Sequence, residues 1–484
     1  MSKSIKLNAL FKTILSVVNI IFPLLVGPYV ARVLSVEGYT EYNKAMSMMN
    51  WFNPFAIFGV YTYGMRTVSQ IKNDKEKLSK LFTSLFSFNI FSALLVTMVY
   101  LILILTIPSF AQYKFLYILF SFQIFSVCFS TDYVNEAFEN YGFILVKSFI
   151  CRLLYVIAVF LFVKTSDDTT IYVLLGTISV LTNNLLTFIY SKTKISFTKV
   201  SISDFVSLIK PLFIVFLLVN SSMLFTIFDR FMLIWFGNKL NLTYYNISQT
   251  IILAVVNVTT SIMLVSIPRL SFYWGNNKKE EYSELLEKSS ATFLCLHTPC
   301  CIGIAALAFE VIYIYSGSKY IAATPTLLLF AIRYYFSAYD MIFAKQILLA
   351  TGNEKILTKI YYFTGLINII FKILLVIFNK LTPELCIITT LICDILIIIL
   401  QVFSIKKLGL NIKLPIAKFL KYIITSLIFI PIIILVKQFI PTDDIVSILL
   451  RSVISIVVCS IIYASMLFIT KDYFVNILFK GLKK

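Results

Sequence analysis

Long apolar runs separated by short polar segments cover almost the whole chain. A helix that crosses the hydrocarbon core of a bilayer needs about 20 mostly apolar residues. Reading the runs by length predicts an all-α polytopic membrane protein with fourteen transmembrane helices. Their approximate ranges are 10–32, 40–65, 81–107, 115–137, 142–163, 169–191, 208–236, 243–268, 289–316, 321–349, 356–379, 383–405, 416–438 and 446–470.

The composition supports this interpretation and excludes other classes. Of the 484 residues, 59% are apolar and 13% are charged, whereas a soluble chain carries roughly 25% charged residues. A soluble enzyme, a DNA-binding protein and a disordered scaffold are therefore excluded. The polar segments are too short for an extramembrane catalytic domain, and no GxxxxGK[ST] loop is present, so we expect no enzymatic activity. The eight cysteines and the single His297 form no metal-ligand spacing, so we expect no metal and no bound cofactor.

The basic residues predict the orientation of the chain. If the N-terminus is cytoplasmic, the inner loops and tails hold 26 Lys and Arg residues, and the outer loops and helix ends hold 9. Membrane proteins concentrate Lys and Arg on the cytoplasmic side. We therefore expect both termini to be cytoplasmic, in a multi-pass protein of the cell membrane. Most of the net charge of +19 follows from this topology, so it does not indicate an acidic partner such as a nucleic acid. The Ile-, Lys-, Asn- and Phe-rich composition favours a bacterial source.

Two short matches indicate an internal repeat. VEGYTEYNKAMSM (36–48) and KLNLTYYNISQTI (239–251) share T-x-Y-N at an offset of 203 residues, and a weaker pair, EAFENYG (136–142) and QILLATG (346–352), shares its final glycine at an offset of 210. Duplicated halves are how many transporters build a central substrate path. The matches predict an N-terminal lobe, a C-terminal lobe and an appendix of two helices with a cytoplasmic tail. Their ranges are 1–205, 206–412 and 413–484.

Four stretches carry a resemblance to a known family: PYVARVLSVEGYTEYNKA, DRFMLIWFGNKLNLTYYNISQ, YSGSKYIAATPTLLLFAIRYYF and KQILLATGNEK. Together with the predicted pattern of six, six and two helices, they resemble the Wzx-type polysaccharide flippases. These belong to the multidrug/oligosaccharidyl-lipid/polysaccharide (MOP) exporter superfamily. The resemblance covers nearly the whole chain. It implies two six-helix lobes around a central cavity that opens alternately to each side, with helices 1, 2, 7 and 8 at the portal and helices 3, 6, 9 and 12 peripheral.

Polar residues at helical spacing within the predicted spans mark candidate site residues. Ionisable groups at membrane depth are expensive, so they indicate either a transport pathway or a buried pair. We expect spans 2, 5, 8, 10 and 11 to face a wet environment, and spans 13 and 14 not to. The candidate cavity residues are Arg152, Tyr155, Arg333, Lys372, Asn50, Asn257 and Asn368, and the candidate coupling or charge-pair residues are Asp340, Asp229 and Arg230.

A purely structural role for these residues stays open beside the functional one. Arg333 and Asp340 lie two turns apart on one helix and could either neutralise neighbours in a packed interior or line a cavity. We expect Asp340 to hold Arg333 while the cavity is empty. For Asp229 and Arg230 a hinge or interface role is as well supported as a transport role. For Asp394 we expect a local hydrogen-bonded partner.

The candidate cations favour one cargo. If Arg152, Arg333 and Lys372 share a cavity, they suit the diphosphate or acidic sugars of a lipid-linked cargo. We therefore expect a flippase that carries a lipid-linked oligosaccharide repeat unit to the outer leaflet for capsular or other surface polysaccharide, with membrane lipids and a polysaccharide polymerase as partners. The alternatives are a cation-coupled drug or metabolite antiporter, a flippase of a lipid-linked peptidoglycan precursor, and a structural membrane scaffold. A coupling proton or sodium ion stays open.

Overall fold

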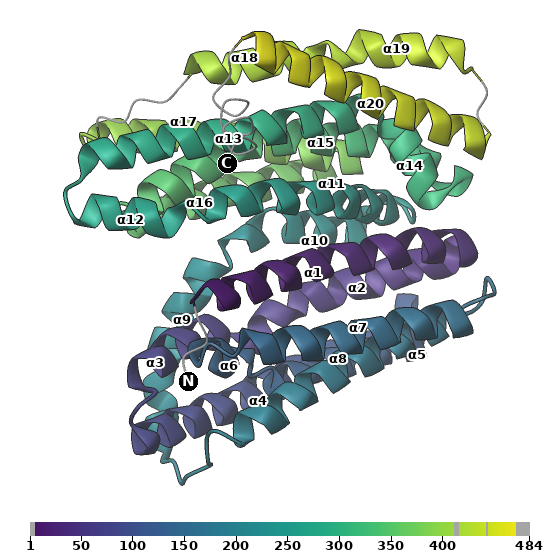
Figure 1. Ribbon diagram of the computed structural model, residues 1–484. Coiled ribbons are helices and arrows are strands. Elements are labelled where there is room, and N and C mark those ends of the chain that lie inside the picture. Colours follow the sequence, from purple (N-terminus) through teal and green to yellow (C-terminus); the bar gives the residue numbers. More distant parts are fainter. Residues whose placement is uncertain (1–4, 411–415, 442–443, 471–484) are drawn as a thin grey trace. The chain divides into compact units, whose positions relative to one another are not determined.

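The computed structural model describes residues 5–410, 416–441 and 444–470, so the two chain ends, on which the predicted orientation partly depends, lie outside the described residues. All regular secondary structure in these ranges is helical (Figure 1). Within them, thirteen helices are long and apolar enough to cross a membrane. The fourteen helices predicted from the sequence are close to this number, and the range without a counterpart is 40–65. The chain is a multi-pass helical membrane protein.

The chain divides into two compact units, Met1–Trp235 and Phe236–Lys484. The first unit extends beyond residue 205, where the sequence predicted the first lobe to end, because α9 packs against α3 and α4. The predicted division of the chain into two lobes and an appendix stays a prediction. The helices of the first unit are α1 (Ile5–Val33), α2 (Val36–Ile57), α3 (Val60–Ile71), α4 (Lys75–Thr106), α5 (Lys114–Ser126), α6 (Asp132–Ala137), α7 (Tyr141–Phe162), α8 (Thr169–Lys192), α9 (Ile202–Val219) and α10 (Thr226–Phe236), with short 3-10 turns η1 (Pro108–Phe110), η2 (Val127–Phe129) and η3 (Ser221–Leu224).

The second unit holds the remaining helices. They are α11 (Asn241–Leu264), α12 (Ile267–Gly275), α13 (Lys279–Ala306), α14 (Ala308–Ser316), the 3-10 turn η4 (Ser318–Ala323), α15 (Thr324–Met341), the π-helix η5 (Ile342–Leu349), α16 (Glu354–Ile377), α17 (Pro383–Lys407), α18 (Ile416–Leu427), α19 (Phe429–Phe439) and α20 (Ile445–Ile469). α18 and α19 pack on α13, and α20 packs on α14 and α19.

Both units repeat one packing scheme, which supports the internal repeat read from the sequence. In the first unit α2 packs on α4 and α5, α4 on α5, and α8 on both α5 and α7. In the second unit α11 packs on α13 and α15, α13 on α15, and α17 on both α15 and α16. In each half, the sixth membrane span (α8 or α17) therefore lies against the fourth (α5 or α15) and the fifth (α7 or α16).

The predicted span 40–65 is broken into α2 and α3. Phe58 and Gly59 take left-handed backbone conformations, with φ of 45° and 79°, and a left-handed residue ends a helix. A Cβ on Gly59 would lie 2.8 Å from the carbonyl oxygen of Leu212 in α9, so the break also lets α9 approach closely. Hydropathy does not show this break, because it depends on backbone geometry.

The predicted span 208–236 is also broken. α9 ends at Val219, Asn220 caps it by donating from its side chain to the carbonyl of Phe216 (2.9 Å), and the turn η3 leads into α10. Within a bilayer, irregular backbone is tolerated where it is buried in protein or lines a cavity. The breaks in α2–α3 and α9–α10 therefore mark a place where the first unit departs from simple helix packing.

Candidate functional site

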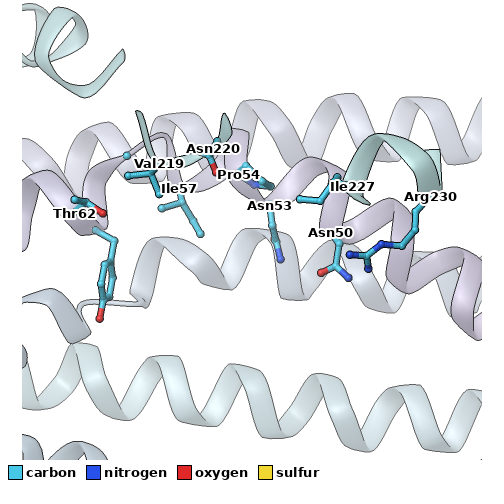
Figure 2. Close-up of a pocket in the computed structure, with 11 residues that line it drawn as sticks. Asn50, Asn53, Pro54, Ile57, Thr62, Val219, Asn220, Ile227 and Arg230 are labelled. Carbon is cyan, nitrogen blue, oxygen red and sulfur yellow. The ribbon is translucent and has the colours of Figure 1, made fainter. Parts of the chain in front are cut away.

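A pocket of about 470 Å³ lies in the first unit beside the two helix breaks (Figure 2). Its walls come from α2, the start of α3, the end of α9 and α10. Most of its polar groups are amides and hydroxyls. The lining residues are Asn50, Asn53, Pro54, Ile57, Gly59, Tyr61, Thr62, Val219, Asn220, Ile227 and Arg230.

The two breaks supply the polar surface of the pocket. Discontinuous helices build binding sites in transporters because their interrupted ends present polar groups at membrane depth. Here Asn220 lies at the end of α9, and Tyr61 and Thr62 lie in the first turn of α3. On α2, the side-chain oxygen of Asn53 is buried and accepts no hydrogen bond from the described residues. A buried polar atom of this kind is costly unless a ligand or water satisfies it.

Aromatic contacts hold the walls of the pocket together. The ring of Trp51 on α2 stacks on Phe231 of α10 with centroids 4.5 Å apart. Phe58, at the end of α2, stacks on Phe216 of α9 with centroids 5.1 Å apart. Such pairs add to the burial of their surface. They keep the broken helices side by side, so the pocket is a built feature of the first unit.

One end of the pocket is tied to a carboxylate. Tyr61 donates to Oε1 of Glu136 (2.8 Å), and Lys12 of α1 lies 4.0 Å from Oε2 of the same carboxylate. Glu136 belongs to α6 and is not among the pocket-lining residues. These contacts link α1, α3 and α6, so a movement of Tyr61 would change the interactions among all three helices.

The structure brings two of the sequence-predicted residues together in this pocket, Asn50 and Arg230 (Figure 2). The side chain of Arg230 is anchored by a 3.4 Å contact from Nε to the carbonyl of Thr226. Its neighbour Asp229 is completely buried and does not line the pocket. The proposed role of Asp229 and Arg230 as a coupling pair stays a prediction.

Three other candidates do not line this pocket. Arg152 and Tyr155 lie on α7 of the same unit, where Tyr155 approaches Tyr172 with ring centroids 6.4 Å apart. Asn257, on α11 of the second unit, is exposed. Arg152 belongs to the first unit, whereas Arg333 and Lys372 belong to the second, so their expected convergence stays a prediction.

In the second unit, Arg333 pairs with Asp394 and not with Asp340. Nε of Arg333 on α15 lies 2.8 Å from Oδ2 of Asp394 on α17, and both side chains are buried. The expectation that Asp340 holds Arg333 is wrong, because α17 places a carboxylate closer. The expectation of a local partner for Asp394 is confirmed by the same contact.

Lys372 on α16 is buried in the contact with α17. Its ammonium donates to the carbonyl of Cys386 (2.5 Å) and to the hydroxyls of Thr389 and Thr390. The Thr390 hydroxyl in turn donates to the side-chain oxygen of Asn368 (3.3 Å). Lys372 and Asn368 therefore have protein partners inside the second unit.

Asp340 lies at the C-terminal end of α15 and also has partners on α16 and α17. Tyr361 donates to its Oδ1 at 2.9 Å, and Gln401 donates to the same oxygen at 2.6 Å. Thr390, Asp394 and Gln401 recur at intervals of four and seven residues, so they share one face of α17. We call the contacts of this face with α15 and α16 the polar ladder. The stripes of spans 10 and 11 thus face a complementary stripe on α17, which corrects the expectation that they face a wet cavity.

Sequence reasoning missed several residues of the pocket and the carboxylate that is hydrogen-bonded to one of them. Tyr61, Thr62 and Glu136 were not candidates because they belong to short helices beside a backbone break. Asn53 and Gly59, six residues apart in the predicted span 40–65, are the sequence signal for this break. Asn220 likewise interrupts an apolar run.

Three comparisons with known proteins agree with this architecture. The family model described as "Polysaccharide biosynthesis protein" matches residues 5–274. A protein of Shigella dysenteriae described as an O-antigen transporter is 20% identical over 406 residues, which cover 83% of this chain and 100% of that protein. The solved structure of the lipid II flippase MurJ, in an inward closed conformation, has a TM-score of 0.74 at 18% identity and covers 95% of this chain and 98% of that one. An inward-facing multidrug resistance MATE transporter of the MOP superfamily has a TM-score of 0.55 at 11% identity, over 81% of this chain and 99% of that one. At these identities the structural matches show the fold alone.

Proposed function

Because the chain belongs to the polysaccharide biosynthesis protein family, we propose that it is a flippase for a polyprenyl-diphosphate-linked oligosaccharide repeat unit. In this proposal it moves the saccharide headgroup from the cytoplasmic to the outer leaflet by alternating access. The relative described as an O-antigen transporter and the fold shared with a lipid II flippase support a cargo made of a saccharide on a lipid.

The chemistry of the pocket is the observation that carries the proposal. Among the eleven residues drawn in Figure 2, Arg230 is the charged one, and the other polar groups are three asparagine amides, a tyrosine and a threonine. Amides and hydroxyls both donate and accept hydrogen bonds, as sugar hydroxyls do. A guanidinium is suited to bind a phosphate or a carboxylate by two parallel hydrogen bonds.

A mechanism follows from these groups. Asn50 and Asn53, one turn apart on α2, bind sugar hydroxyls while Arg230 holds the diphosphate or an acidic sugar. The lipid tail stays in the bilayer and only the polar headgroup enters the protein. The Tyr61–Glu136 hydrogen bond lies at one end of the pocket, so its rupture lets α3 move as the pocket changes the side to which it opens.

Two alternatives receive different support. The lining of the pocket contains no Asp or Glu among the described residues, which disfavours a cationic drug as cargo. A lipid-linked peptidoglycan precursor has the same class of chemistry as a lipid-linked oligosaccharide, and the lipid II flippase fold keeps it as the second candidate. The two differ in the saccharide and in the pathway that their loss interrupts.

Deletion of the gene tests the function. We expect the lipid-linked repeat unit to accumulate on the cytoplasmic leaflet and the surface glycan to disappear. Complementation with Arg230→Ala should restore export to only about a tenth to a hundredth, because a hydrogen bond to a charged group is worth about 1.5–3 kcal/mol. Arg230→Lys should restore more, since it keeps the charge and loses the forked geometry.

The matched control is Arg66→Ala, which removes an exposed arginine of α3 in the same unit and should export normally. Rescue of cells depleted of their lipid II flippase, with the surface glycan intact in the deletion strain, would establish the second candidate and reject the first. Full export by Arg230→Ala would reject the assignment of the pocket.

A further inference from the structure

Both units contain a carboxylate near the end of their fourth membrane span (α5–α6 in the first unit, α15–η5 in the second). Each carboxylate accepts hydrogen bonds from the fifth span (α7 or α16) and the sixth span (α8 or α17). In the first unit, Asp132 at the start of α6 accepts from Lys147 of α7 at 3.1 and 3.2 Å and from Thr187 of α8 at 3.2 Å. In the second unit, Asp340 accepts from Tyr361 of α16 and Gln401 of α17. We call these the Asp132 node and the Asp340 node.

The two nodes are equivalent positions of the internal repeat. Asp340, Tyr361 and Gln401 follow Asp132, Lys147 and Thr187 by 208, 214 and 214 residues. The two sequence matches recur at 203 and 210 residues, and both units use the same packing of the fourth, fifth and sixth helices. Each node also adjoins an irregular helix, the 3-10 turn η2 before Asp132 and the π-helix η5 after Asp340. Short π-helical segments are frequent at functional sites.

The difference between the nodes is the residue on the fifth helix. Lys147 is buried and forms an ion pair with Asp132, so the first carboxylate is neutralised by a fixed charge. Tyr361 and Gln401 are neutral donors, and no Lys or Arg of the described residues lies within ion-pair distance of Asp340. Asp340 is half-buried. A carboxylate at membrane depth without a paired cation is stabilised by binding one.

The other groups around Asp340 leave this position open to a cation. Asp394 of α17 and Lys345 of η5 are the charged groups whose fields act on it. Arg333, on its own helix, is paired with Asp394. On α13, His297 contacts the backbone carbonyl of Tyr334, and Tyr282 donates to the carbonyl of Gln346.

We propose that Asp340 is a proton-binding site of the second unit, and that the Asp132–Lys147 pair is its permanently charged counterpart in the first. A proton from the aqueous phase forms an O–H bond on the Asp340 carboxyl and removes its negative charge. The hydrogen bonds from Tyr361 and Gln401 are then weakened, because donors bind a charged acceptor about twice as strongly. Proton binding therefore weakens the contact of the end of α15 and η5 with α16 and α17. In the first unit, the contact of α6 with α7 and α8 is unchanged, because Asp132 stays paired with Lys147. Its coupling to export rests on the proposed function.

Infrared difference spectroscopy of the full chain in lipid vesicles, without cargo, tests the site. On acidification, wild type should gain the carbonyl band of a protonated carboxyl that Asp340→Asn lacks. Surface carboxyls contribute equally to both proteins, so the subtraction isolates Asp340. The matched control Asp132→Asn should keep the band. Added sodium at neutral pH should leave the wild-type spectrum unchanged.

Retention of the whole band in Asp340→Asn would overturn the proposal, and so would a sodium response in place of the acid response. If Asp340→Asn does not fold, Tyr361→Phe keeps the carboxyl and removes one of its donors. The band should then appear under less acidic conditions than in wild type, and an unchanged onset would overturn the proposal. Because no cargo is present, failure here leaves the flippase proposal intact, and failure of export in the deletion test leaves the proton site intact.

Discussion

The pocket of the first unit and the polar ladder of the second arise from similar stripes of polar residues, yet they have opposite structures. Around the pocket, α2–α3 and α9–α10 are broken, and the Asn53 side-chain oxygen has no described hydrogen-bond donor. In the ladder, α15, α16 and α17 supply donors and acceptors to one another. A polar stripe lines a cavity only where no neighbouring helix presents a matching stripe. The residues of the neighbouring helix therefore decide whether a polar stripe lines a cavity or forms a helix–helix contact.

The largest effect should come from separating the ion pair of the ladder. Arg333→Ala leaves Asp394 buried without its arginine, and breaking a buried pair costs about 3–5 kcal/mol. We expect the thermal transition of the purified protein to fall sharply and its level in the membrane to drop.

The double variant Arg333→Met with Asp394→Leu separates stability from transport. Replacing both partners by apolar groups of similar volume is often neutral, so the double variant should recover most of the stability. If it is also fully active in export, the ladder is structural. Normal stability of Arg333→Ala, with export abolished, would instead place Arg333 in the transport path.

A smaller effect should come from the break that forms the pocket. Gly59→Ala places a Cβ at a φ of 79° and 2.8 Å from the Leu212 carbonyl. Strain of this kind costs about 1–3 kcal/mol. The matched control is Gly303→Ala in α13, where a Cβ meets nothing within 4 Å. We expect thermal unfolding to show a loss for Gly59→Ala and none for Gly303→Ala, and equal losses would contradict the close approach of α9 to the break.

The smallest effect should come from an exposed carboxylate between α7 and α8. Asp168 accepts from the backbone N–H groups of Thr165 (2.7 Å) and Lys164 (2.8 Å), and these bonds lower the pKa of its carboxyl. A lowered pKa means that the contribution to stability is present above the unfolded-state pKa and is lost as the pH falls through the folded-state pKa. Asp168→Asn should therefore differ slightly from wild type in thermal stability at neutral pH and match it in acid. A difference that grows in acid would contradict the sign.

Much of the fold was predictable and less of the site was. Hydropathy alone placed thirteen spans, since each needs only length and apolar composition. The break at Gly59 was not predictable, because it depends on backbone conformation. Asn50 and Arg230 were found as polar residues at membrane depth, and the structure places them in one pocket. The pairing of Arg333 with Asp394 and of Asp340 with Tyr361 and Gln401 depends on the register between helices distant in sequence. A single sequence does not contain that register.

Two tyrosines allow the most direct test of the difference between the pocket and the ladder. Tyr61 lines the pocket and donates to Glu136, whereas Tyr361 belongs to the ladder and donates to Asp340. Replacing each in turn by the photoreactive p-benzoylphenylalanine gives matched probes of similar shape. With a radiolabelled lipid-linked oligosaccharide in native membranes, we predict that the cargo crosslinks at position 61 and not at position 361. Crosslinking at position 361 with none at position 61 would contradict the account and place the cargo in the ladder.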